Sequence, residues 1–131
     1  MERALGIGGF FFRAADPQAL VEWYRERLGV ATMAPAGDGD VWQQQAGPTV
    51  FAPFAQDTDY FGRPEQSFML NFRVADLDAM LDQLRTAGVE VDERVELLEG
   101  IGRFGWATDP EGNRIELWEP TDEADAGEGV A

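Results

Sequence analysis

The chain has 131 residues, a length that fits one domain, and it contains neither cysteine nor histidine. This composition excludes disulfides, zinc–sulfur sites and any Ser–His or Cys–His catalytic machinery within one chain. The formal net charge of −15 repels nucleic acid and anionic membranes and attracts a cationic ligand. The alternative explanation of this acidity is that it only keeps the protein soluble. The N-terminal MERALGIGG lacks the features of a signal peptide, and no apolar run approaches the ~20 residues that span a bilayer. We therefore expect a cytoplasmic protein with no nucleic-acid or membrane partner.

Two segments of the sequence resemble each other at an offset of 60 residues. The first, FFRAADPQALVEWYRERLGV, begins at Phe11, and the second, NFRVADLDAMLDQLRTAGVEV, begins at Asn71. Six residues of the first segment recur at the equivalent positions of the second: Phe12, Arg13, Ala15, Asp16, Ala19 and Arg25. Each segment reads as a strand followed by a helix, so the chain is predicted to contain one module twice.

The helices of the two modules are marked by local signals. The first is predicted over residues 17–28, and Asp16 precedes it as an N-cap whose carboxylate can accept hydrogen bonds from the free N–H groups of the first turn. Gly29 follows the last helical residue, as is typical of a helix end. The second helix is predicted over residues 77–87, with the equivalent cap at Asp76.

Short strand-like runs follow each helix, near residues 31–34, 41–45, 49–53, 91–95, 103–108 and 114–119. The sequence DPEG, from Asp109 to Gly112, is a strong turn signal between the last two runs. These elements predict an α+β fold of two tandem βαβββ modules, at about residues 5–54 and 67–120, joined by a linker at 55–66. Eight strands would form a curled mixed sheet around a pocket, with one helix outside each half.

The end of the chain differs in composition from the rest. The last eleven residues, TDEADAGEGVA, carry four acids and no base, which is typical of a disordered tail. We therefore expect a single folded domain over residues 1–120, followed by an acidic disordered tail at 121–131.

The repeated strand–Asp–helix pattern and the closing WATDPEGNRIELWEP resemble the vicinal oxygen chelate superfamily. This superfamily includes glyoxalase I, the bleomycin resistance proteins and the extradiol dioxygenases. The resemblance covers about residues 5–120. It implies paired βαβββ modules whose sheets curl around a pocket, and a chain that works as a homodimer.

The resemblance also indicates where a metal would be held. Metal-dependent members take one ligand from the first strand and one from the last strand of each module. In this sequence the first-strand places are Gly9 and Met69. The last-strand places are Glu116 in the second module and a position at or near Phe51 in the first. Only Glu116 suits a hard divalent cation, and such ions need several ligands, so we predict neither a metal nor another cofactor.

The strand alternation places side chains on two faces of the predicted sheet. Ile115 and Leu117 are expected under the helix, which leaves Glu116 and Trp118 facing the pocket. Three interpretations of Glu116 stay open: an acid that is solvated or paired with arginine, a ligand contact, or a metal ligand. If it is poorly solvated and unpaired, its carboxylate is a candidate catalytic acid or base.

Aromatic residues gather on the pocket-forming strands and the linker: Trp42, Phe51, Phe54, Tyr60, Phe61, Phe104, Trp106 and Trp118. Rings with a few polar groups suit a flat organic ligand and, in acidic surroundings, a cationic one, although aromatic strand residues also serve as plain core. The predicted ligand-binding residues are Phe11, Trp42, Phe51, Met69, Asn71, Trp106, Glu116 and Trp118.

Three functions follow from these residues. The first is a metal-free protein that binds a small organic molecule of cationic or aromatic character, similar to the bleomycin resistance proteins. The alternative is an enzyme, either a glyoxalase-type lyase or isomerase or a relative of the dioxygenases, in which Glu116 would hold a metal or move a proton. A third interpretation is a partner-binding module. A binder needs only complementarity to its ligand, and the sequence favours it over an enzyme, which needs a matched acid, base or metal.

Overall fold

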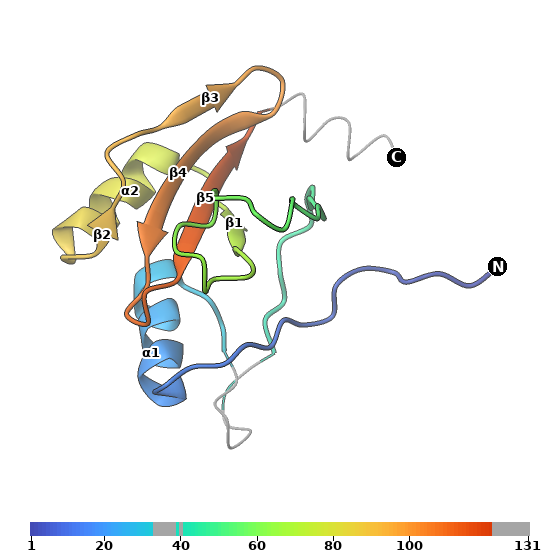
Figure 1. Ribbon diagram of the computed structural model, residues 1–131, viewed down its shortest axis with the longest axis horizontal. Helices are drawn as coiled ribbons and strands as arrows, with labels where there is room; N and C mark the ends of the chain where they lie inside the picture. The colour runs from blue at the N-terminus through green and yellow to red at the C-terminus, as the bar shows by residue number, and fades with distance from the viewer. Residues whose placement is uncertain (33–38, 40, 122–131) are drawn as a thin grey trace.

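The computed structural model describes residues 1–32, 39 and 41–121, which form an α+β fold with two helices and an open, mixed sheet of five strands (Figure 1). The elements in chain order are α1 (Pro17–Leu28), β1 (Asn71–Arg73), α2 (Leu77–Thr86), β2 (Glu90–Val91), β3 (Glu96–Leu98), β4 (Gly102–Thr108) and β5 (Arg114–Pro120). The predicted fold class is thereby confirmed. The predicted tail lies outside the described residues except for Thr121. Neither α1 nor α2, the helices of the described chain, is long and apolar enough to cross a membrane.

Both helices begin where the sequence predicts. The Asp16 carboxylate accepts a hydrogen bond from the Ala19 amide at 3.1 Å, and Asp76 does the same for Ala79 at 3.0 Å. These bonds satisfy N–H groups that have no partner inside the helix. Gly29 ends α1 in the left-handed region at φ 71°, where a residue with a Cβ is disfavoured.

The C-terminal half folds as one βαβββ module whose second strand is in two pieces. The sheet order is β1-β5-β4-β2, and β3 also pairs with β4. β1 runs parallel to β5, whereas β4 is antiparallel to β5, β2 and β3. The single strand predicted near residues 91–95 is therefore replaced by β2 and β3, which pair with opposite ends of β4.

The core lies between the helices and one face of the sheet. Its buried members are Leu20, Tyr24, Leu77, Leu81, Leu84, Ala107, Ile115 and Leu117. The alternation on β5 is as predicted, with Ile115 and Leu117 in this core. α2 packs closely on β4 because Gly105 has no side chain there, and a Cβ at that position would lie 3.1 Å from the methyl groups of Leu81.

α1 is attached to the turn between β4 and β5. The Tyr24 hydroxyl donates a hydrogen bond to the buried Asp109 carboxylate at 2.7 Å. The carboxylate of Glu111, in the same turn, accepts hydrogen bonds from the backbone amides of Ala15 and Asp16 at 2.7 and 3.0 Å. A helix of the first half is thus positioned by the last hairpin of the second half.

The first half does not form the strands that were predicted for it. Among the described residues, 5–14 and 41–54 are in no strand, and Figure 1 shows the N-terminal arm extending away from the sheet. The predicted run at 31–34 lies partly outside the described residues. The described residues form five strands, so the expected sheet of eight is wrong for this part of the chain: a strand needs a neighbouring strand for its N–H and C=O groups, and residues 5–14 and 41–54 pair with none.

Candidate functional site

Glu116 lies on the face of the sheet opposite the helices, and its carboxylate is buried, with the residue 7% exposed. Oε1 accepts a hydrogen bond from Asn71 Nδ2 at 2.7 Å, and Oε2 accepts one from Trp106 Nε1 at 3.0 Å. Oε2 also accepts a hydrogen bond from the Tyr60 hydroxyl. Three neutral donors therefore surround a buried acid, which explains how a charged residue can sit between Ile115 and Leu117.

The sheet register brings two of these donors together. Asn71 on β1 and Trp106 on β4 are the direct partners of Glu116 on the neighbouring strands. Side chains that are directly opposite in a sheet project from the same face, so the three groups meet by strand pairing alone. Among the described residues, the ion pairs involve other acids, so an ion pair of Glu116 with an arginine, one of the interpretations left open by the sequence, is not observed.

The third donor comes from the linker. Tyr60 packs edge-on against Trp106, with ring centroids 6.2 Å apart and planes at 87°, and stacks on Phe54 at 5.6 Å and 17°. Burial, followed by the hydrogen bond to Glu116, raises the pKa of the Tyr60 hydroxyl well above its ordinary value, so it remains a donor. The sequence grouped Tyr60 with the pocket aromatics but gave no signal that it reaches Glu116.

Two arginines enclose the indole of Trp106. The guanidinium carbons of Arg94 and Arg114 lie 4.8 and 5.1 Å from its ring centroid, within the range of cation–π attraction. Trp106 is 0% exposed, so its ring is accessible to a ligand only if a covering group moves. Arg114 also lies 3.5 Å from Asp92 and donates from Nε to the carbonyl of Tyr60 at 3.2 Å, which connects the linker to β5.

The structure brings together only some of the predicted ligand-binding residues. Asn71, Trp106 and Glu116 are in direct contact, and Asn71 is the exposed member of the three. Trp118 is buried near them, where it donates to the Ile101 carbonyl at 3.0 Å, and Met69 is half-buried two residues before β1. The roles of these residues toward a ligand remain predictions.

The remaining predicted residues lie elsewhere. Phe11 and Phe51 are 94% and 86% exposed on the segments that form no strand. Trp42 is near Phe72, with ring centroids 6.4 Å apart, and lines a groove of about 380 Å³ between α1, β1 and α2. This groove is lined mainly by side chains of the helix-covered side, and Glu116 is not part of its wall.

The residues present do not fit a metal centre of the superfamily's type. The described chain contains no group of three or more acidic, histidine or cysteine residues placed to hold an ion. Glu116, the one carboxylate at a ligand position, accepts hydrogen bonds on both oxygens from N–H and O–H groups. A cation there would have to displace those donors and would find no second anionic ligand beside it.

The sequence matches the family described as Glyoxalase-like domain over residues 9–118, and the chain therefore belongs to this family. Among the solved structures that it resembles, one is described as a member of the glyoxalase/bleomycin resistance protein/dioxygenase superfamily. A comparison with curated proteins finds no match.

Three solved structures illustrate the shared fold. TnmS3, an antibiotic binding protein from Streptomyces sp. CB03234, is 24% identical with a TM-score of 0.61, over 92% of this chain and 100% of that one. A lactoylglutathione lyase from Agrobacterium tumefaciens is 18% identical with a TM-score of 0.60, over 90% and 96%. A superfamily member from Sphaerobacter thermophilus DSM 20745 is 20% identical with a TM-score of 0.53, over 81% and 90%. At these identities the likeness establishes the fold alone.

Proposed function

We propose that this protein binds a small organic molecule, of aromatic or cationic character, in a site that uses no metal. The observation that carries the proposal is the set of hydrogen bonds around Glu116. Its partners Tyr60, Trp106 and Asn71 are all neutral donors, as in a recognition site. Tyr60 is the one titratable group among them, and its raised pKa makes its hydroxyl a poor proton donor for catalysis near neutral pH.

The binding surface is the face of the sheet formed by β1, β4 and β5 beneath the linker. Asn71 is the accessible polar group of this surface. Its side-chain amide donates one hydrogen to Glu116, and its other amide hydrogen and its oxygen are available to a ligand. The net charge of −15 favours a cationic ligand at long range. The antibiotic-binding activity of TnmS3, which has this fold, is consistent with a small-molecule ligand.

The proposed working form is a cytoplasmic homodimer. Phe11 and Phe51 expose most of their surface, together with the neighbouring Ile7 and Val50, which are 57% and 68% exposed. A second copy that covers these side chains would remove a large apolar area from water, at roughly 25 cal/mol per Å². It would also supply a neighbour for the extended segments.

A ligand screen by intrinsic tryptophan fluorescence tests the proposal, because Trp106 contacts Glu116 directly. Cationic and neutral aromatic compounds are titrated into the wild-type protein and into Asn71→Ala. We expect a hit to lose about tenfold or more in affinity in Asn71→Ala, since two ligand hydrogen bonds are lost, and to keep its affinity in Gln18→Ala, an exposed change on α1. Compounds that bind Asn71→Ala as tightly as the wild type would show that this face of the sheet is not the binding site.

The alternative is a glyoxalase-type lyase or isomerase with Glu116 as base, and the shared fold with a lactoylglutathione lyase favours it among enzymes. Turnover of the hemithioacetal of glutathione and methylglyoxal, abolished in Glu116→Gln, would establish it. Thermal melts of chelator-treated protein with added nickel, zinc or manganese decide the metal question, because an ion bound to the native state alone raises the midpoint.

A further inference from the structure

Tyr60 occupies the centre of the proposed site in the manner of a bound ligand. Its hydroxyl donates to Glu116, its ring makes an edge-on contact with Trp106, and Phe54 stacks on it. The phenol comes from the linker, not from a strand of the sheet. It therefore belongs to the covering segment and not to the floor of the site.

We propose that Tyr60 fills the subsite of the ligand's own aromatic hydroxyl, so that the ligand is a phenol-bearing molecule that binds by displacing Tyr60. This inference rests on the proposed binding function and specifies its ligand class. A phenol replaces both groups that Tyr60 contributes to the subsite: the flat ring beside Trp106 and the O–H donor to Glu116. An aryl ether or an unsubstituted ring would leave Oε2 of a buried carboxylate short of a donor, which is unfavourable.

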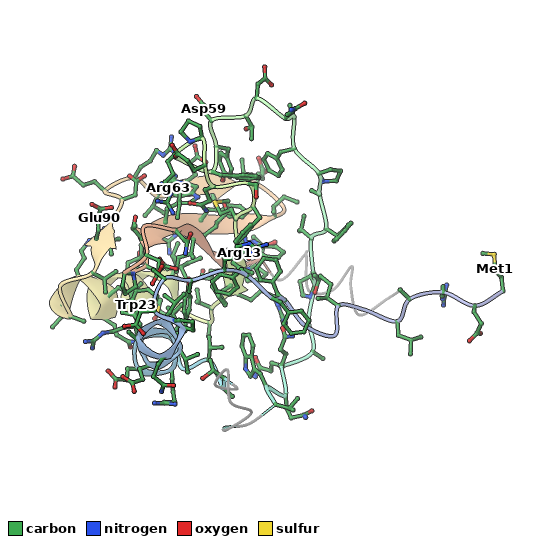
Figure 2. The ribbon with its side chains drawn as sticks, turned by 60° about the horizontal axis from the view of Figure 1, so that its bottom comes forward. Met1, Arg13, Trp23, Asp59, Arg63 and Glu90 are labelled. Carbon is green, nitrogen blue, oxygen red and sulfur yellow. The ribbon has the colours of Figure 1, made fainter. Side chains whose placement is uncertain are left out.

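The two ends of the linker are held by different contacts, and the end that carries Tyr60 is joined to the sheet through Tyr60 itself. Beyond Gly62, the side chain of Gln66 is fixed by hydrogen bonds at 2.8 to 2.9 Å to the backbones of Phe68 and Arg114, and Arg63 donates to the Glu111 carbonyl at 3.2 Å. Residues 54–57 and 59 before Gly62 are exposed, as are residues 62–65, so the two ends differ in their hydrogen bonds and not in their exposure. Figure 2 shows Asp59 at the outer end of this segment and Arg63 nearer the sheet.

Gly62 marks the boundary between the two ends of the linker. Its φ of 89° lies in the left-handed region, which glycine adopts without strain. The segment that carries Phe54 and Tyr60 can therefore change direction at Gly62 while the residues from Arg63 onward stay in place. The backbone contact that must break is the hydrogen bond from Arg114 Nε to the Tyr60 carbonyl.

Displacement has a consequence for affinity. A ligand binds only the fraction of molecules in which Tyr60 has left the subsite, so the observed Kd exceeds the intrinsic Kd by the reciprocal of that fraction. Tyr60→Ala removes the competitor and leaves a space of the shape of a phenol. We expect Tyr60→Ala to bind p-cresol, the isolated side chain of tyrosine, at least tenfold more tightly than the wild type does.

The experiment compares p-cresol with toluene, which has the same ring and methyl group without the hydroxyl, by calorimetry and tryptophan fluorescence. Tyr60→Ala should prefer p-cresol over toluene by about tenfold or more, the effect of one hydrogen bond to a buried carboxylate. The double variant Tyr60→Ala, Glu116→Gln should reduce that preference. Equal affinity for both compounds, or no binding of p-cresol to folded Tyr60→Ala, would overturn the inference.

If Tyr60→Ala does not fold, Tyr60→Phe keeps the ring and removes only the hydroxyl. Amide hydrogen exchange should then become faster in residues 54–62 and stay unchanged in β4 and β5, whereas uniform acceleration or no change would count against a displaceable linker.

The failures of the two proposals are distinguishable. A compound whose affinity depends on Asn71 but is equal for the wild type and Tyr60→Ala would support the binding function and contradict the displacement of Tyr60. If the wild type gives no hit, phenol-bearing compounds included, the binding function ends and the displacement of Tyr60 ends with it, even where Tyr60→Ala binds p-cresol selectively.

Discussion

The N-terminal and C-terminal halves of the molecule differ in what their apolar side chains contact. In the C-terminal half, Leu77, Leu81 and Leu84 are at most 1% exposed beneath the sheet. In the N-terminal half, Phe11 and Phe51 are almost fully exposed, and only α1 has a regular place in the fold. The comparison teaches that a repeat in sequence need not give strands in both copies, because a strand depends on a pairing partner as well as on its own residues.

The sharpest test of this comparison is truncation of a side chain in each half. Leu81→Ala should lower the free energy of unfolding by about 3 kcal/mol, because it removes buried methyl groups from the contact between α2 and Gly105. Urea unfolding at low protein concentration measures the change.

The matched control in the other half is Phe51→Ala, which should change the same quantity by less than about 0.5 kcal/mol, as for an exposed side chain in a monomer. A loss for Phe51→Ala as large as that for Leu81→Ala would break the comparison, since it would place Phe51 in a core of the single chain.

The connection between the halves can be weakened at Tyr24. Tyr24→Phe deletes the hydrogen bond to Asp109 and should cost about 1.5 to 2 kcal/mol, a value typical of a buried bond to a charged group. Asp109 keeps its other donors, two backbone amides and the Asn113 side chain, so the turn should remain formed. Unchanged stability by thermal or urea unfolding would mean that this hydrogen bond contributes little and that α1 is held by apolar packing and by the bonds of Glu111 to the Ala15 and Asp16 amides.

The exposed surface of the first half predicts self-association. Phe51→Ser should weaken the proposed homodimer by about tenfold, equivalent to about 1.4 kcal/mol, because it removes apolar area from the interface. Sedimentation velocity over a range of concentrations measures this, with Gln18→Ala as the control. A wild-type protein that is monomeric at high concentration would contradict the prediction.

The tyrosines predict a pH dependence that connects the two halves. Burial raises the pKa of both Tyr24 and Tyr60, the two tyrosines of the chain, above the ordinary value of roughly 10, and their hydrogen bonds to Asp109 and Glu116 raise it further. The stability associated with a raised pKa is fully present below about pH 10 and is lost as the pH rises towards the folded-state pKa.

The raised pKa values of the two tyrosines can be tested by following the absorbance of phenolate as the pH is increased. Tyrosine ionisation should coincide with alkaline unfolding measured by circular dichroism, without an earlier step. A tyrosine that titrates near pH 10 in the folded protein would contradict the prediction for that residue, and Tyr60→Phe identifies which one it is.

The features that the sequence predicts well are local. Asp16 and Asp76 lie next to the N–H groups that they cap, and the alternation of Ile115, Glu116 and Leu117 depends only on strand geometry. The family resemblance then singled out Glu116, which the structure places in a buried network.

The features that the sequence does not predict depend on the path of the chain through space. Tyr60 reaches Glu116 across 56 positions, and no spacing rule links a linker tyrosine to a strand acid. The strands expected at residues 41–54 fail for the same reason, because strand pairing is decided by a distant partner and not by the propensity of the segment itself.

The hydrogen bonds of Glu111 to the chain entering α1 have a consequence for synthesis. The carboxylate that receives the Asp16 amide is made 95 residues later, so at about 5 to 20 residues per second α1 waits roughly 5 to 19 s for its anchor. During this interval the apolar side of α1 has no sheet to cover, and the nascent chain resembles an aggregation-exposed intermediate. The hydrogen bonds that hold the start of α1 can therefore form only after the turn between β4 and β5 has been synthesised.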